Sequence, residues 1–168
     1  IIRLIERMGL DYQLCAPTGR AAKRMSEATG CAAIADDSGL AVDALNGEPG
    51  VYSARYAPGG HDATDKERYE YLLKKMGDAE NRKAKFVSSI CCLLPDGSVI
   101  CTEGECNGSI LPAPRGEGGF GYDPVFMPDG YDKSMAQLGT DFKNTISHRA
   151  RALAKFKEEL RIHNGTDK

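Results

Sequence analysis

The spacing of hydrophobic positions predicts two helices and a β-hairpin in the part of the chain that follows residue 63. Thr64-Asp65-Lys66-Glu67 has the form of a capping box, and apolar residues recur behind it at helical spacing as far as Gly77. Residues 84–94 and 98–106 have the pattern of two strands joined by a tight turn, which predicts a hairpin. A last helix opens within 143–149. Its expected buried stripe is Ile146, Ala150, Leu153, Phe156 and Leu160.

The first part of the chain predicts two further helices and one buried strand. Apolar residues recur at helical spacing over 1–8, and a second helical pattern covers 18–29, where Lys23 lies. The short apolar run 31–35 is typical of a buried strand, and Ser38-Gly39 shortly after it is a turn signal. Since α/β domains more often open with a strand, we expect further residues ahead of this sequence.

Two adjacent acids, Asp36 and Asp37, follow the predicted strand directly. Carboxylates at the end of a strand stand on a rigid base and point into the loop region, where open α/β sheets bind ligands. Adjacent strand residues face opposite ways, so we expect the two acids to have different tasks. One can meet a metal ion or a water while the other ties down the loop. An Asx-type turn with solvated acids is the alternative interpretation.

Glycine, proline and aromatic residues are concentrated between Pro112 and Pro124. The glycines allow close backbone approach, and Phe120 and Tyr122 offer faces for stacking on a planar ring. The segment fits neither the P-loop nor the dinucleotide fingerprint, because no G-x-x-x-x-G-K follows a strand and no helix follows the glycines. We expect a ligand-facing loop, and a Gly-rich turn with a purely structural role is the alternative.

Basic residues cluster where the last helix is expected to begin. Ser147-His148-Arg149 would occupy its first turn, and Lys143 lies just ahead. Free N–H groups and the helix dipole favour anions there, so cations are out of place unless they serve a ligand. A capping Ser beside incidental charges is the alternative.

Composition is that of an ordinary globular protein. The chain has 168 residues, 41% hydrophobic and 27% charged, which favours a single domain with a real core. A net charge of −2 argues against broad nucleic-acid binding, although it allows one nucleotide in a local basic pocket. No apolar run is long enough to span a bilayer and no signal peptide is visible, so we expect no membrane partner.

The chain contains six cysteines, and Cys91-Cys92 lies inside a predicted strand. Because no C-x-x-C pair occurs, a zinc site is not expected. We expect buried, reduced thiols in a cytoplasmic protein.

Three separated motifs resemble those of the inosine triphosphate pyrophosphatase family, the house-cleaning nucleotidases for non-standard purine nucleotides. The first is Ala35-Asp36-Asp37-Ser38-Gly39-Leu40 together with residues 50–56. The second is residues 118–124, and the third is residues 143–149. The resemblance covers the chain from about Ile34 to Phe156, in the family's order and spacing.

The resemblance implies an α/β fold, a two-lobed single domain over residues 1–168. A long twisted mixed β-sheet, flanked by helices, would floor a cleft between the lobes. The implied reaction is Mg²⁺-dependent hydrolysis of ITP, dITP or XTP to the monophosphate and pyrophosphate, which removes these purine nucleotides from the nucleotide pool. The resemblance also implies a homodimer.

Residue roles carry over from the same resemblance. Asp37 matches the catalytic acid, a general base that also belongs to the metal site, and Asp36 is a supporting acid at that metal site. Lys23 stands where the family has a nucleotide-binding lysine. The other implied substrate contacts are Ser38, Phe120, Gly121, Tyr122, Asp123, Lys143, His148 and Arg149.

The N-terminal part departs from the family. Members carry a first strand, a loop that grips the triphosphate, and a further loop whose Glu is a metal ligand. Here only Thr18-Gly19-Arg20-Ala21-Ala22-Lys23 stands near the helix that follows those parts. We expect the strand and the loop before residue 18 to be missing from the chain as printed. A purine-nucleotide-binding or sensing module of the same fold, impaired in catalysis, is therefore the alternative function.

Overall fold

The structure is a computed structural model that describes residues 23–24, 26–27, 30, 32–163 and 165. The helix predicted over 1–8 and most of the helix predicted over 18–29 lie outside these residues, as does Cys31. In chain order the elements, with η for short 3-10 helices, are β1 (Ala33–Val42), η1 (Asp43–Leu45), β2 (Pro49–Gly50), η2 (Ser53–Arg55), η3 (Gly60–Asp62), α3 (Asp65–Met76), β3 (Lys83–Leu93), β4 (Val99–Ile110), η4 (Asp123–Val125), β5 (Phe126–Pro128), α4 (Met135–Leu138), α5 (Thr140–Ile146) and α6 (His148–His163).

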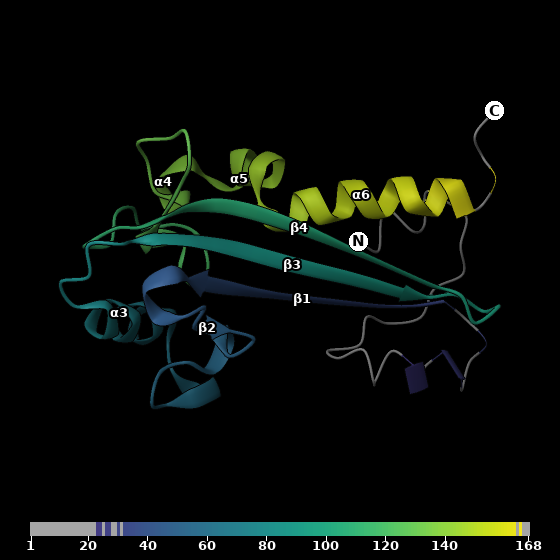
Figure 1. The fold of residues 1–168 in the computed structure, drawn as a ribbon, viewed down its shortest axis with the longest axis horizontal. Helices are drawn as coiled ribbons and strands as arrows, with labels where there is room; N and C mark the ends of the chain where they lie inside the picture. The colour runs from purple at the N-terminus through teal and green to yellow at the C-terminus, as the bar shows by residue number, and fades with distance from the viewer. Residues whose placement is uncertain (1–22, 25, 28–29, 31, 164, 166–168) are drawn as a thin grey trace. The chain divides into compact units, whose positions relative to one another are not determined.

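The strands form one sheet in the order β2-β1-β3-β4-β5, as predicted for an α/β fold with helices against a sheet. The pairs β1–β2 and β4–β5 are antiparallel, and neighbouring long strands run in opposite directions (Figure 1). The expectation of a mixed sheet is therefore wrong for the strands between residues 33 and 128, because none of them has a parallel neighbour.

The described residues divide into two compact units. Unit 1 holds those up to Asp37, residues 88–104 and those from Arg149 onward, and unit 2 holds residues 38–87 and 105–148. Each unit has a hydrophobic cluster of its own. Two units agree with the predicted two lobes, whereas the cleft between the lobes stays a prediction.

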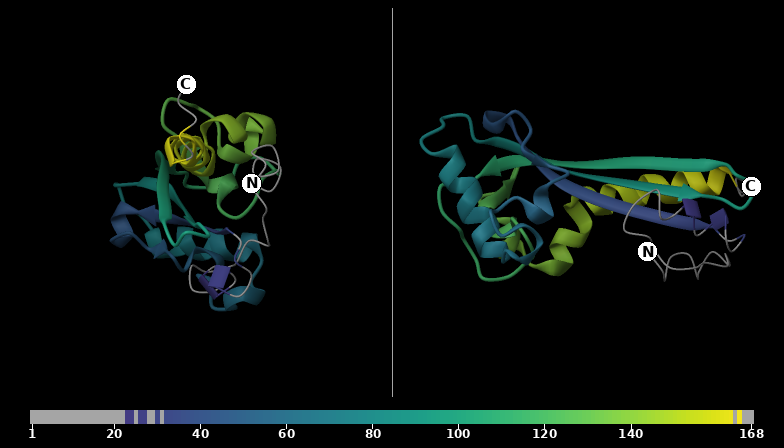
Figure 2. Two further views of the ribbon diagram at one scale, coloured as in Figure 1. Left: turned by 90° about the vertical axis from the view of Figure 1, so that its right-hand side faces the viewer. Right: turned by 90° about the horizontal axis from the view of Figure 1, so that it is seen from below.

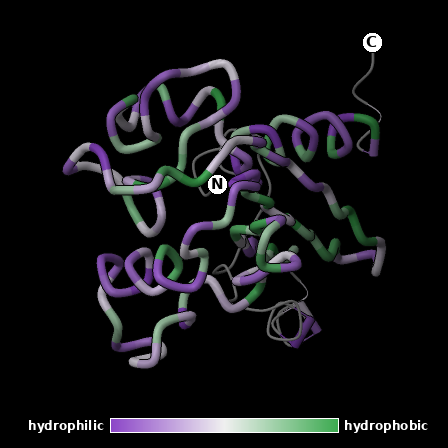
Figure 3. Tube along the Cα trace, turned by 60° about the vertical axis from the view of Figure 1, so that its left-hand side comes forward, coloured by the Kyte–Doolittle hydropathy of each residue, from purple (hydrophilic) through white to green (hydrophobic). Residues whose placement is uncertain are grey.

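Unit 1 is built from helix α6 lying along the sheet (Figure 1). Ala152, Phe156 and Leu160 of α6 are buried against the side chains of Ile34, Ile90, Cys92 and Leu94. The spacing of four residues puts the three α6 positions on one face of the helix. Hydrophobic and hydrophilic positions accordingly alternate along the traces of helices and strands (Figure 3).

Unit 2 packs helices on both sides of its part of the sheet, α3 on one side and α4 and α5 on the other (Figures 1 and 2). Helix α3 begins with the predicted capping box, in which Thr64 Oγ1 accepts from the Glu67 amide and Glu67 Oε2 accepts from the Thr64 amide. Leu72 and Met76 of this helix are buried. The capping box, the helix and its end at Gly77 are confirmed.

Strand β1 continues through the segment where the sequence predicted a turn. It includes Asp36, Asp37, Ser38 and Gly39 and ends only at Val42. The turn prediction is wrong because β2 pairs with the end of β1, Leu40 lying opposite Gly50. A Cβ on Gly39 would lie 2.4 Å from the carbonyl oxygen of Gly50, so glycine at this position permits the close approach of two backbones.

The predicted hairpin is confirmed as β3 and β4, but β4 runs four residues beyond the expected end at Cys106. The added part of β4 pairs with β5, from Gly108 opposite Pro128 to Ile110 opposite Phe126. Strand β5 has only three residues and ends in proline, so its own pattern does not predict it and its effect on β4 was missed.

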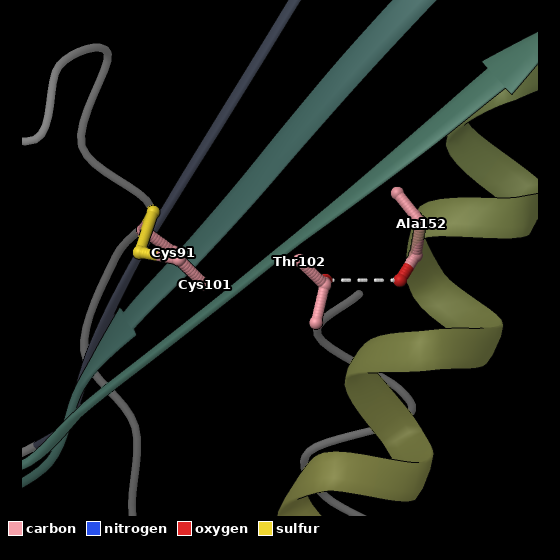
Figure 4. The surroundings of a disulfide bond; sticks show 4 residues. All are labelled: Cys91, Cys101, Thr102 and Ala152. Atoms are coloured by element: carbon pink, nitrogen blue, oxygen red, sulfur yellow. Dashed lines mark hydrogen bonds between the residues drawn. A yellow bond between two sulfur atoms is a disulfide. The ribbon is translucent and has the colours of Figure 1, made fainter.

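A disulfide joins Cys91 of β3 to Cys101 of β4. The expectation of reduced thiols is wrong for this pair, while Cys92 and Cys106 are buried and do not belong to a disulfide. Figure 4 shows the disulfide on one side of the strands, and on the other side the hydroxyl of Thr102, which donates to the carbonyl oxygen of Ala152 in α6 at 3.1 Å. Cys91 and Cys101 can bond because they lie on neighbouring strands with their Cα atoms 4.1 Å apart.

The basic segment 143–149 spans two helices where one was predicted. Lys143 belongs to α5, Ser147 ends that helix with extended backbone angles, and α6 begins at His148. The prediction that Ser147, His148 and Arg149 lie at the start of the last helix is confirmed, whereas the separate helix α5 just before it was not predicted. Among the described residues, no helix is long and apolar enough to cross a membrane.

Candidate active site

Asp36 lies in β1 and has both of its carboxylate oxygens engaged within unit 1. Oδ1 accepts from the Ser88 hydroxyl at 3.2 Å, and Oδ2 accepts from Arg149 Nε at 2.8 Å. The Asp36 side chain is 15% exposed, and Ser88 is fully buried. Hydrogen bonds to a charged carboxylate are among the stronger ones, so Asp36 is fixed in place.

Asp37, the next residue of β1, is exposed. Because side chains alternate along a strand, Asp37 is on the opposite face of β1 from Asp36 and Ser38. The prediction that the two acids face different ways is confirmed by this strand geometry. The strand holds the backbone of Asp37 rigidly, and solvent can reach its carboxylate.

The loop 118–123 of unit 2 is organised by the carboxylate of Asp123. This side chain is 2% exposed, pairs with the Lys143 ammonium of α5, and accepts from the Phe120 amide at 2.8 Å. Gly119 has φ +92°, and a Cβ there would lie 2.6 Å from Asp123 Oδ2. Glycine is thus required at this position for both its backbone angle and its lack of a side chain.

Phe120 and Tyr122 of this loop are in opposite situations. Phe120 is 76% exposed, whereas Tyr122 is buried and donates from its hydroxyl to the carbonyl oxygen of Ser53 at 2.9 Å. Burial raises the pKa of Tyr122 well above its usual value. Tyr122 therefore belongs to the packing that supports the loop, and the aromatic face left open is that of Phe120.

His148 and Arg149 are neighbours at the start of α6 with different surroundings. The His148 ring is 7% exposed and stacks on Phe86, with 4.9 Å between centroids and 15° between planes. The side chain of Arg149 is half exposed and bound to Asp36. Lys23 is on the surface, where its ammonium pairs with Glu27 at 3.9 Å.

The structure thus brings some of the predicted residues together in each unit. Asp36 meets Arg149 in unit 1, and Asp123 meets Lys143 and Phe120 in unit 2. The sequence analysis assigned no role to three supporting residues: Ser88, Ser53 and Asp65, whose Oδ2 accepts from the Gly121 amide at 2.8 Å. Ser88 carried a usable signal, because it is the polar residue in the otherwise apolar row of core-facing positions of β3.

Metal-binding groups are sparse in the part of the chain that the structure describes. No three His, Cys, Asp or Glu side chains there are grouped to hold a metal ion. Mg²⁺ is commonly held by only one or two carboxylates together with substrate phosphates and water. The exposed carboxylate of Asp37 fits that mode, while both oxygens of Asp36 already accept hydrogen bonds, from Ser88 and from Arg149.

These features define an α/β protein with two segments suited to a ligand, an acidic strand and a carboxylate-held loop that displays an aromatic ring. The chain belongs to the Ham1 family, whose sequence model matches residues 17–159. The membership predicted from the three motifs is thereby confirmed.

Curated relatives are similar over most of this chain. The dITP/XTP pyrophosphatase of Deinococcus deserti is 48% identical over 155 residues, which cover 91% of this chain and 71% of that protein. The dITP/XTP pyrophosphatase of Thermus thermophilus is 53% identical over 131 residues, covering 77% of this chain and 62% of that protein. The chain thus spans roughly two thirds of the length of these relatives.

Solved structures of the same kind match as well. The Staphylococcus aureus Ham1 protein superimposes with a TM-score of 0.82 at 39% identity, over 95% of this chain and 85% of that one. The dITP/XTP pyrophosphatase of Mycobacterium abscessus gives a TM-score of 0.71 at 41% identity, over 86% and 80% of the two chains.

Proposed function

We propose that this protein hydrolyses non-standard purine nucleoside triphosphates (ITP, dITP and XTP) to the monophosphate and pyrophosphate. The observation that carries the proposal is the 48% identity over 91% of the chain to a dITP/XTP pyrophosphatase. An exposed carboxylate on a strand and an exposed aromatic ring on a fixed loop support it. The protein would remove these nucleotides from the pool.

Asp37 acts as the general base in this proposal. Its carboxylate orients a water molecule and takes a proton as the water oxygen bonds to the α-phosphorus. The bond from the α-phosphorus to the α,β-bridging oxygen breaks, and pyrophosphate leaves with the electron pair. Asp36 holds Arg149 and, through Ser88, fixes the strand that carries Asp37.

The proposed metal ion is Mg²⁺, with Asp37 as the principal protein ligand and Asp36 beside it in sequence. When bound with the nucleotide, Mg²⁺ supplies positive charge that offsets the charge of the phosphates. Since phosphoryl chemistry depends mainly on positioning and electrostatics, the cations Lys23, Lys143 and Arg149 are suitable partners for the phosphates or the base.

The loop 120–123 recognises the purine ring in this proposal. Phe120 offers its face for stacking, and Gly121, Tyr122 and Asp123 fix the backbone around it. Hypoxanthine and xanthine carry a 6-oxo group where adenine carries an amine, so donors such as Lys143, His148 and Arg149 favour these bases. A site that leaves a donor unpaired rejects the wrong base strongly. Ser38 is proposed as a further contact of the substrate.

Pyrophosphate release from ITP in the presence of Mg²⁺ tests the proposal, with GTP and ATP as the comparison substrates. We expect turnover of ITP that greatly exceeds turnover of GTP and ATP and that stops when Mg²⁺ is removed. Tight binding of ITP without turnover would instead support the sensing module, and turnover of ATP at the same rate would contradict the proposed specificity.

We further propose that the chain acts as a single catalytic domain, as a homodimer, in the cytoplasm where nucleotide pools are used. Sedimentation tests the dimer. The Cys91–Cys101 disulfide is unusual for a reducing compartment, so thiol trapping in fresh cell extracts tests the location. A fully oxidised pair in such extracts would contradict a cytoplasmic protein.

A further inference from the structure

The amide groups of two consecutive loop residues are both bound by carboxylates. The Phe120 amide donates to Asp123 Oδ2 at 2.8 Å, and the Gly121 amide donates to Asp65 Oδ2, also at 2.8 Å. Asp123 is near in sequence, but Asp65 is 56 residues away, at the first position of helix α3. Hydrogen bonds to ionised acceptors are about twice as strong as neutral ones, so this pair of bonds fixes the loop firmly.

Asp65 is itself held in place by a second contact. Its Oδ1 accepts from Arg68 Nη1 at 2.8 Å, and Arg68 Nη2 donates to the carbonyl oxygen of His61 at 3.1 Å. The Arg68 side chain is only 13% exposed. The carboxylate of Asp65 therefore has one oxygen on the helix side and one on the loop, and it joins α3 to the loop.

The loop has a reason to need such a tie. The Phe120 ring is 76% exposed, so packing by neighbouring side chains does little to set its direction. Its orientation depends on the backbone of Phe120 and Gly121, and Gly121 has φ +63°. Losing one of the two carboxylates would let this backbone sample other conformations.

We propose that Asp65 is a positioning residue for recognition of the purine base. It acts through the Gly121 amide, which fixes the loop so that the Phe120 ring is presented in one orientation before the nucleotide arrives. This inference rests on the proposed function, in which Phe120 stacks on the base. In this proposal Asp65 acts only through the loop and contacts neither the substrate nor the reacting atoms.

The kinetic test compares Asp65→Ala with Glu67→Ala in the same helix. Glu67 completes the capping box of α3 by accepting from Thr64, whereas the amides of Phe120 and Gly121 donate to Asp123 and Asp65, so removal of Glu67 weakens the helix alone. We expect Asp65→Ala to raise the KM for ITP by about tenfold while kcat changes less than about threefold. Glu67→Ala should leave both constants near the wild-type values. An equal rise of KM in both variants would overturn the proposal.

Hydrogen exchange of the Gly121 amide tests the same inference without nucleotide or turnover. Exchange at Gly121 should be faster in Asp65→Ala than in wild type and unchanged in Glu67→Ala. Unchanged exchange in Asp65→Ala would overturn the tie between Asp65 and the loop. A wild-type protein that does not release pyrophosphate from ITP would overturn the proposed function. The exchange result would still decide whether Asp65 holds the loop at Gly121.

Discussion

The acidic strand of unit 1 and the aromatic loop of unit 2 are both fixed by hydrogen bonds to carboxylates, but they expose different kinds of side chain. In the strand, the carboxylate of Asp36 is tied to Ser88 and Arg149, and the neighbouring carboxylate of Asp37 stays exposed. In the loop, the carboxylates of Asp123 and Asp65 bind the backbone amides, and the exposed group is the ring of Phe120. Each segment thus fixes its backbone while one side chain stays exposed to solvent, that of Asp37 in the strand and that of Phe120 in the loop.

The largest effect is expected in the strand, from Asp37→Asn. Loss of the carboxylate removes the proposed general base, so the rate of pyrophosphate release from ITP should fall by about 10²–10⁴-fold. The free energy of unfolding should change by less than about 0.5 kcal/mol, because Asp37 is exposed. Retention of more than about a tenth of the wild-type rate would contradict the role given to Asp37.

The loop counterpart is Asp123→Ala, which should chiefly affect stability. It removes the partner of Lys143 and the acceptor of the Phe120 amide, and the Asp123 side chain is 2% exposed. We expect the free energy of unfolding in urea to fall by about 2–4 kcal/mol. The control, Asp132→Ala at an exposed position, should change little. Equal stability of the two variants would show that the buried pair does not hold the loop.

Reduction of the Cys91–Cys101 disulfide tests whether the stability of unit 1 depends on this covalent cross-link. The described residues of unit 2 contain no such cross-link. The closed loop is short, with a separation of 10 residues, so reduction should lower the free energy of unfolding by about 1–3 kcal/mol. A reductant should lower the Tm of the wild type and have no effect on the double variant Cys91→Ser/Cys101→Ser. If the wild type is insensitive to reductant, the disulfide does not stabilise the fold.

The smallest effect is expected from Tyr122→Phe, which removes one hydrogen bond behind the loop. The cost should be about 1 kcal/mol. Because burial raises the pKa of Tyr122, the folded protein favours the neutral phenol, and the contribution is complete below the ordinary pKa of a tyrosine. The stability difference between the two proteins should therefore be constant from about pH 6 to 9 and shrink above about pH 10. A difference that varies between pH 6 and 9 would contradict this assignment.

Local signals in the sequence were enough to predict several elements. The capping box at Thr64 and the stop at Gly77 define α3, and the turn at Asp96 defines the hairpin. The disulfide also had a signal that was not used, because Cys91 and Cys101 are equidistant from Asp96 along the hairpin. Such positions lie opposite each other on antiparallel strands.

The remaining features depend on contacts between distant residues. Strand β1 continues past Asp37 because β2 pairs with its end, and Asp36 is bound by Ser88, which lies 52 residues away. The tie from Asp65 to Gly121 spans 56 residues. The sequence motifs predicted which residues belong to the candidate site. The tertiary fold decides which of them are bound by other residues to stabilise the structure and which are exposed to solvent.

The most direct test of the account is a titration of the protein with Mg²⁺ and a non-hydrolysable ITP analogue, followed by NMR at individual amides. The proposal that one nucleotide engages both segments predicts shifts at Asp37 and Ser38 and at Phe120 and Gly121, all saturating with the same Kd. Shifts in only one of the two segments, or two different Kd values, would contradict it.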